Sequence, residues 1–317
     1  MFAVPARKLE VTISNDACKN ANAILTCKVA LLGQAGPEWP RNHWQEVDAV
    51  QARTVFRSLA WIIERIRDID GHVDSWVDVH CHDGARNCER CAPTPPRLLW
   101  KKIERKMKPV EDSSQAGAYE QALKYRPSAF VTQLKLDEES GVGMVHIGVN
   151  IPSLVHRAVA RLPTEHRPEA PKVSWRLTTD YTPPAKLHLP KFQLSGNKRD
   201  PEHTQPPNFR IPLRPEQLRS LGWMIKQESV NVPPFIEEEI AEAILEPLGW
   251  RAEGRAQRPV HVRGGVLADE VGYGKTAITL GLIDSAPPRK ADAPPPSLAH
   301  GRIPVGGTLV VVPPHLT

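Results

Sequence analysis

The residues of this sequence that point most directly to chemistry form a glycine-bearing turn between a short apolar strand and a helix. The strand is expected at residues 266–268, and residues 269–276 read DEVGYGKT. A helix that begins directly after such a turn directs backbone N–H groups and the positive end of its dipole at an anion. In loops of this kind the lysine reaches the β- and γ-phosphates and the next hydroxyl holds Mg²⁺. We therefore expect Lys275 to bind phosphate and Thr276 to bind the metal ion.

The loop departs from the common phosphate-binding pattern in one informative position, because Asp269 stands where the first glycine belongs. Together with GGVLA at residues 264–268, it resembles the loop of Swi/Snf-type ATPases, the helicase-like DNA translocases of chromatin remodelling and DNA repair. Residues 213–224, LRPEQLRSLGWM, resemble the family segment whose glutamine reads the adenine edge of ATP, a role that falls by resemblance on Gln217. Residues 307–316, GTLVVVPPHL, resemble the family's next motif, a buried strand that ends in a loop lying on DNA.

This resemblance implies an α/β fold class, with the start of a RecA-like P-loop lobe whose parallel sheet is truncated in this chain. It implies ATP and Mg²⁺ as cofactors, double-stranded DNA or nucleosomes as partners, and the nucleus as the location. The function implied is the ATP-binding portion of an ATP-dependent DNA translocase in chromatin remodelling or DNA repair. The residues expected to bind the cofactor, with Thr276 also as metal ligand, are Gln217, Asp269, Glu270, Gly272, Gly274, Lys275 and Thr276.

Two parts that hydrolysis needs in this family are absent from the sequence. The family's acidic pair and the arginine finger of its second lobe both follow the motif at residues 307–316, and the sequence ends at Thr317. We therefore expect no catalytic residue here, although the parent family is a DNA-dependent ATP hydrolase, and we expect an N-terminal piece of a longer protein or an incomplete gene product. The alternative is a non-catalytic DNA- or partner-binding protein with a decayed nucleotide fold. Tyr273 and the proline-rich insertion after it are more similar to fungal members of the branch that couples the motor to ubiquitin ligation in post-replication repair.

Composition sets broader limits. The 317 residues are 40% hydrophobic, enough for a core, but 32 prolines are about twice the average usage and predict much irregular chain. A net charge of +5 is compatible with nucleic acid without requiring it. Five cysteines in a chain of this length favour a reducing compartment over a disulfide framework. Neither a signal peptide nor a membrane-spanning apolar run is recognisable, so we expect no membrane partner.

A cluster of cysteine and histidine residues could hold a structural zinc ion. Cys88 and Cys91 have the spacing of a zinc half-site, and Cys81 with His80 or His82 could complete a Cys₃His shell. The two halves are closer in sequence than in common zinc modules. The simpler alternative is a loop of reduced, partly buried cysteines.

Residues 97–108 are strongly basic and are expected to form a short helix, with Trp100 among the charges. A solvated outer helix face is the commoner explanation of such a pattern. The alternative is a contact with the DNA backbone, which would be sensitive to salt and indifferent to sequence.

The chain divides by composition into four parts. We expect an α+β accessory region at 1–125 that could bind protein partners, a hairpin and helix at 126–162, a proline-rich linker or extended chain at 163–210, and the first part of the ATPase lobe at 211–317. Within them we expect strands at 8–12, 24–32, 129–136, 143–149 and 173–177, helices at 50–69, 152–162 and 235–245, and a polar loop at 251–263.

Overall fold

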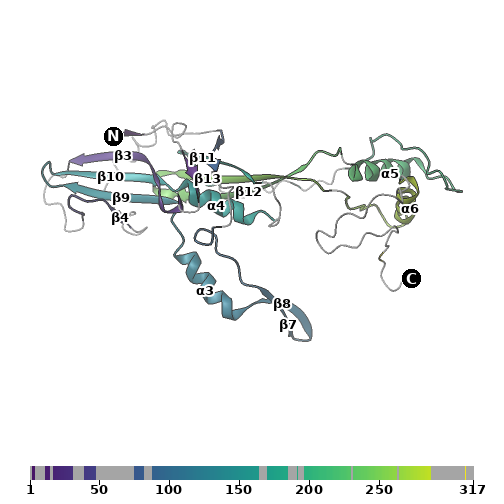
Figure 1. The fold of residues 1–317 in the computed structure, drawn as a ribbon, viewed down its shortest axis with the longest axis horizontal. Helices are drawn as coiled ribbons and strands as arrows, with labels where there is room; N and C mark the ends of the chain where they lie inside the picture. The colour runs from purple at the N-terminus through teal and green to yellow at the C-terminus, as the bar shows by residue number, and fades with distance from the viewer. Residues whose placement is uncertain are drawn as a thin grey trace, which may run out of the picture. The chain divides into compact units, whose positions relative to one another are not determined.

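The structure is a computed structural model, and it describes residues 2–3, 11–14, 17–30, 39–47, 75–81, 88–163, 170–184, 191, 196–229, 231–262, 264–286 and 311. The chain forms two compact units (Figure 1). Unit 1 comprises Met1–Leu187 and Ile236–Pro259, and unit 2 comprises His188–Phe235 and Val260–Thr317. The predicted helix at 50–69 lies outside the described residues, as does most of the predicted strand at 8–12.

The larger sheet of unit 1 is built around a long β-hairpin. Its five strands lie in the order β1 (Phe2–Ala3), β3 (Asn22–Ala30), β10 (Val142–Val149), β9 (Phe130–Asp137) and β4 (Gln45–Val47). The four neighbouring pairs are antiparallel. Burial alternates along β9, as expected for a strand with one face on a core. The hairpin predicted from the sequence at 129–149 is confirmed.

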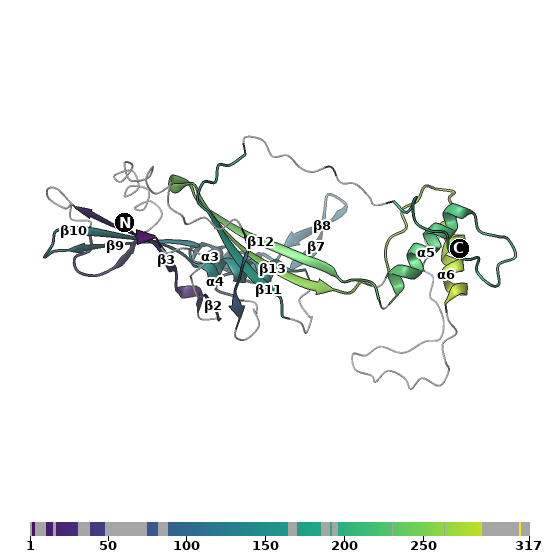
Figure 2. The ribbon, with the colours of Figure 1, turned by 90° about the horizontal axis from the view of Figure 1, so that it is seen from above.

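A second sheet carries strands in the order β12 (Phe235–Leu245), β13 (Trp250–Val260), β11 (Lys172–Thr178) and β5 (Val77–Asp78). Figure 2 shows β11, β12 and β13 running alongside one another. β11 confirms the extended stretch expected at 173–177. A smaller parallel pair joins β2 (Thr12–Ile13) to β6 (His80–Cys81). These elements share one hydrophobic core, whose largest fully buried side chains include Trp175 and Trp250.

The helix α4 (Ile151–Arg161) belongs to this core and has eight buried residues. Asn150 caps it, because its side chain accepts a hydrogen bond from the backbone N–H of Ser153 at 3.1 Å. The helix backbone lies close to β13 at Gly254, where an added Cβ would stand 2.7 Å from the carbonyl carbon of Leu154. Glycine at this position is what allows the helix to approach the sheet.

Two predictions for residues 235–263 are wrong. The helix expected at 235–245 is β12, and the polar loop expected at 251–263 is β13 over most of its length. The two strands are joined by the short 3-10 helix η3 (Glu246–Leu248) and by Gly249, whose φ of +64° suits glycine. Their charges are complementary across the strands, with Arg251 contacting Glu242 at 2.7 Å and Arg255 contacting Glu238 at 3.7 Å. Glu238 and Glu242, in the segment expected to be a helix, therefore form ion pairs across the two strands.

The helices in the described part of unit 2 are α5 (Pro215–Glu228) and α6 (Lys275–Ser285), and α6 confirms the helix expected after the loop at 269–276. They enclose a small core of Leu213, Leu218, Leu221 and Ile278. Among the described residues we find no parallel RecA-like sheet, and of the strand expected at 309–312 only Val311 is described. The fold class and the domain boundaries stay predictions. None of the described helices is long and apolar enough to cross a membrane.

Candidate functional sites

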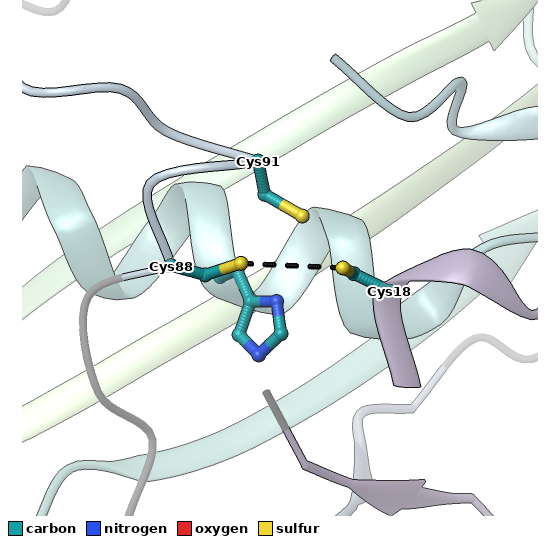
Figure 3. Close-up of side chains that lie close together, drawn as sticks. Cys18, Cys88 and Cys91 are labelled. Carbon is teal, nitrogen blue, oxygen red and sulfur yellow. Dashed lines mark hydrogen bonds between the residues drawn. The ribbon is translucent and has the colours of Figure 1, made fainter. Parts of the chain in front are cut away.

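Three cysteines and one histidine from distant parts of the chain meet in the interior of unit 1. Cys18 lies on the 3-10 helix η2 (Ala17–Lys19), and His156 lies on α4. Cys88 and Cys91 lie in the chain before β7 (Leu98–Ile103). All four side chains are buried, and their sulfur and ring-nitrogen atoms lie within 4.8 Å of one another. Figure 3 shows the sulfur atoms of the three cysteines pointing toward one another, with Cys88 Sγ and Cys18 Sγ 4.0 Å apart. We call these four residues the Cys₃His cluster.

The backbone holds the Cys₃His cluster from two sides. The N–H groups of Cys91 and Ala92 both donate to the carbonyl of Cys88, at 3.0 and 2.9 Å, which forms a tight turn between the two cysteines. Asn150 donates from Nδ2 to the carbonyl of Cys18 at 2.9 Å while it caps α4. One buried amide therefore fixes Cys18 relative to the helix that carries His156.

The zinc ligand set predicted from the sequence is wrong in two of its members. Cys88 and Cys91 do lie together, but Cys81 and His80 belong to β6 and are not part of the cluster. His82 lies outside the described residues. The sequence analysis missed Cys18 and His156 because they lie 70 and 68 residues from Cys88. At such separations no local spacing connects them with the pair Cys88 and Cys91.

Burial favours the uncharged thiol form of Cys91. It raises the pKa of Cys91 far above its usual range, and the neighbouring Cys88 raises it further. Burial also raises the pKa of Cys27 and lowers the pKa of His156. Arg157, beside His156, has its pKa lowered to about 10, mainly by burial and also by Arg126, while the nearby Cys91 acts in the opposite direction.

The loop before α6 gathers the residues that we expected to bind a cofactor. Gly272 and Gly274 both have φ near +87°, and Gly274 is the N-cap of α6. Lys275 Nζ donates to the carbonyl oxygens of Asp269 and Glu270 at 2.7 and 2.8 Å, so the ammonium group lies within the turn. Thr276 is exposed on the first turn of the helix.

Gln217 reaches the same loop from α5. Its Nε2 donates to the carbonyl of Tyr273 at 2.9 Å, and its Oε1 accepts from the N–H of Arg214 at 2.9 Å. An added Cβ on Gly274 would collide with Gln217 Nε2. The structure therefore brings together residues 56 positions apart that the sequence had paired by resemblance. Their role as binding residues stays a prediction.

The basic segment at 97–108 is a β-hairpin, and the predicted helix is wrong. β7 (Leu98–Ile103) pairs with β8 (Lys106–Glu111), and Glu104 and Arg105 form a two-residue turn with φ of +50° and +66°. Positive φ at both turn residues suits the right-handed twist of a hairpin. In Figure 1 the hairpin and α3 (Ser113–Lys124) extend away from the sheets of unit 1.

The hairpin is exposed and positively charged on one face. Side chains directly opposite each other across an antiparallel pair share a face. The register pairs Lys101 with Lys108 and Ile103 with Lys106, so the three lysines lie together. The other face carries Trp100, which is 65% exposed. Two like charges directly opposite each other are unfavourable in a hairpin, and the ion pair of Lys108 with Glu104 at 3.9 Å partly offsets the repulsion.

Comparisons with known proteins match the whole chain to one kind of protein. No protein-family model matches. A DNA (cytosine-5-)-methyltransferase, DMT5, of Cryptococcus neoformans is 43% identical over 333 residues, covering 100% of this chain and 14% of that protein. A protein of the same name from Verticillium dahliae is 45% identical over 98 residues, covering 31% of this chain and 4% of that protein. The human helicase-like transcription factor is 30% identical over 148 residues, covering 46% of this chain and 12% of that protein.

These findings correct the identification made from the motifs. The match along the whole chain is to a protein named as a DNA methyltransferase, whereas the helicase-like match covers less than half of the chain. The prediction of an ATP-dependent DNA translocase of chromatin remodelling or repair is therefore wrong. The alternative of a non-catalytic protein with a decayed nucleotide fold finds no support in these matches. The prediction of ATP and Mg²⁺ as cofactors depended on that identification, and it is therefore wrong as well. The chain spans about one seventh of the methyltransferase that it matches from end to end.

Proposed function

We propose that this chain is a DNA-contacting segment of a nuclear DNA cytosine-5-methyltransferase. The observation that carries the proposal is the 43% identity to such a protein along the entire chain. The reaction transfers a methyl group from S-adenosylmethionine to C5 of cytosine and leaves S-adenosylhomocysteine. The methyl acceptor is a cytosine in DNA, so any part of the enzyme that lies along the duplex can contribute to DNA binding.

The chemical step itself does not fit four of the five cysteines of this chain, which are buried, and the fifth, Cys81, is half-buried on β6. C5 of cytosine becomes nucleophilic when a thiolate adds to C6, which requires an accessible cysteine with a low pKa. Cys18, Cys88 and Cys91 are buried together, and burial raises the pKa of Cys91. Cys27 is buried as well, with a raised pKa. We therefore assign the methyl-transfer chemistry to other parts of the longer protein, and a supporting role to this chain.

The hairpin β7–β8 is the part of the chain best suited to DNA. A two-stranded β-ribbon fits the major groove of B-DNA. Lys101, Lys106 and Lys108 share one face, and Arg105 stands at the tip. Charges of this kind bind phosphate and position a protein without reading sequence. The solvated helix face that we favoured from the sequence is replaced by a ribbon whose three lysines share one exposed face, and this arrangement supports a contact with DNA.

The loop before α6 offers a second contact with anions. We propose that Lys275 and the backbone N–H groups that follow Gly274 bind a phosphate-type group, with Gln217 holding the loop in shape through Tyr273. The N-terminus of α6 supports this assignment, since α6 is eleven residues long and begins at Lys275.

The experiment uses the longer protein that contains this chain. S-adenosylmethionine with a labelled methyl group is incubated with duplex DNA, and the nucleosides are then separated by mass spectrometry. We expect label in 5-methylcytosine, and a lower rate at limiting DNA when the three hairpin lysines are replaced by glutamine. A protein that transfers no label to cytosine under any DNA condition would refute the proposed function.

A further inference from the structure

We propose that Cys18, Cys88, Cys91 and His156 bind one structural zinc ion. The site joins η2, the turn at 88–91 and α4, and it is independent of the proposed role in DNA methylation. Its four members offer three sulfur ligands and one imidazole nitrogen, a combination typical of closed structural zinc sites.

The spacing of the ligand atoms is close to what zinc requires. A zinc–sulfur bond of about 2.3 Å places the sulfur atoms of a tetrahedral site about 3.8 Å apart. Cys88 Sγ and Cys18 Sγ are 4.0 Å apart, and all four ligand atoms lie within 4.8 Å of one another. The sulfur atoms therefore lie within about 1 Å of the separation that one zinc ion requires.

The histidine gives a second, independent reason. His156 is 1% exposed, and neither Nδ1 nor Nε2 has a hydrogen-bond partner. Buried polar atoms are nearly always paired, because an unpaired group loses its hydration without compensation. Coordination to zinc provides the missing partner for one of the two nitrogens. An apolar side chain could fill the same space in the core without the free-energy cost of burying two unpaired ring nitrogens.

The charge of the surroundings also fits. Three thiolates and one zinc ion carry a net charge of −1, which is costly to bury without a cation nearby. Arg157 follows His156 on α4, and its guanidinium group interacts electrostatically with Cys91. Arg157 also donates to the carbonyl of Pro127. A positive charge is therefore held beside the site.

A disulfide explains the cluster less well. The five cysteines all lie in the described part of the chain, and none forms a disulfide. The sulfur atoms of Cys18 and Cys88 are 4.0 Å apart, about twice the length of a disulfide bond of ~2.05 Å. A disulfide would also leave the third cysteine and His156 without a role.

The site would hold the base of the exposed hairpin. Chain from the turn at 88–91 leads directly into β7, and the chain that returns from α3 passes Pro127, whose carbonyl accepts from Ser153 Oγ at 3.2 Å. No residue of α3 is buried, so the arm formed by β7, β8 and α3 is attached to unit 1 through these two ends. Zinc at the first end would fix the arm to α4.

The first experiment measures metal content. The whole chain is purified with a reducing agent and without chelators, and zinc is counted by elemental analysis and by native mass spectrometry. We expect one zinc ion per chain. A folded protein that contains no zinc and gains none from added zinc chloride would overturn the proposal, as would a mass two hydrogens lower that reports a disulfide.

Variants then test the ligands. Cys88→Ser and His156→Gln should each lose stoichiometric zinc, whereas His156→Cys should retain it, because a fourth thiolate completes the same tetrahedral shell. Cys27→Ser and Cys81→Ser are matched controls and should keep zinc. Full retention by His156→Gln and Cys88→Ser together would contradict the assignment.

If a ligand variant fails to fold, cobalt in the unaltered protein decides the question. Cobalt(II) bound by three thiolates and an imidazole gives intense visible bands of tetrahedral symmetry and sulfur-to-metal charge-transfer absorption. Weak octahedral bands without charge transfer would refute the site.

Discussion

Replacing Lys101, Lys106 and Lys108 by glutamine should weaken DNA binding in a way that depends strongly on salt. The three side chains share one face of the β7–β8 hairpin and are exposed. Each lysine that neutralises a phosphate contributes about 0.9 to the slope of log K against log salt concentration. If all three contact phosphates, the slope should fall in magnitude by about 2.7.

The consequence can be stated as a ratio of affinities. Between about 50 and 200 mM salt, a slope difference of about 2.7 changes the ratio of the two dissociation constants roughly 40-fold, or about 2 kcal/mol. The variant should therefore bind much more weakly than the unaltered chain at low salt, and the difference should shrink as salt rises. Fluorescence anisotropy with a labelled duplex, at four or five salt concentrations, measures both slopes.

A control variant separates the hairpin from net charge. Lys28, Lys124 and Lys198 are exposed and lie outside the hairpin, and their replacement by glutamine removes the same three charges from the formal net charge of +5. We expect this control to change the slope by much less than the hairpin variant. Equal slopes for the unaltered chain and the hairpin variant would refute the assignment of the hairpin to DNA, provided that circular dichroism shows both to be folded.

Three further predictions concern the stability of unit 1. Gly254→Ala should lower the free energy of unfolding by about 1–3 kcal/mol or more, because the new Cβ meets the backbone of Leu154 at 2.7 Å. Urea denaturation measures this loss of stability, and an unchanged midpoint would contradict the close packing of α4. Asn150→Ala should lower the free energy of unfolding by about 1–3 kcal/mol, because α4 loses its cap and the carbonyl of Cys18 loses a donor. Thermal unfolding measures this loss, and an effect below about 0.5 kcal/mol would argue against both contacts. Glu253→Leu should lower the free energy of unfolding by about 3–5 kcal/mol, because Arg176 and Arg251 lose a carboxylate that is 2% exposed. Unchanged stability in chemical denaturation would show that these arginines find other partners.

Local signals in the sequence predicted several elements well. The β9–β10 hairpin follows from two apolar runs around a turn with Gly141, whose φ is +64°. The helices α4 and α6 follow from proline or glycine at their starts and apolar residues at helical spacing. The contact between Gln217 and the loop before α6 followed from resemblance, and local pattern alone would not have paired them.

The errors arose where long-range pairing decides the structure. β12 contains a run of glutamates that suits the first turn of a helix, but Arg251 and Arg255 on β13 pair with Glu242 and Glu238 across the sheet. Residues 97–108 fit a helix by their apolar spacing, yet the turn at Glu104 and Arg105 folds them into a hairpin. Propensity is a weak guide when partners far along the chain compete with neighbours.

The Cys₃His cluster could be found only in part from the sequence. The spacing of Cys88 and Cys91 marked half of a site, and the natural completion was the nearest cysteine and histidine. In the structure the other two members of the cluster are Cys18, on η2, and His156, on α4. Only the tertiary arrangement, through Asn150 and the packing of α4, brings these residues together.

The central claim is that this chain contacts DNA within an enzyme that methylates cytosine. The most direct measurement is the rate of methyl transfer from labelled S-adenosylmethionine to duplex DNA by the longer protein, at limiting DNA, for the unaltered enzyme, the hairpin variant and the control variant. The account predicts label in 5-methylcytosine, a raised KM for DNA in the hairpin variant alone, and a rate at saturating DNA that is unchanged. Absence of methyl transfer, or equal KM values for the hairpin and control variants, would contradict it.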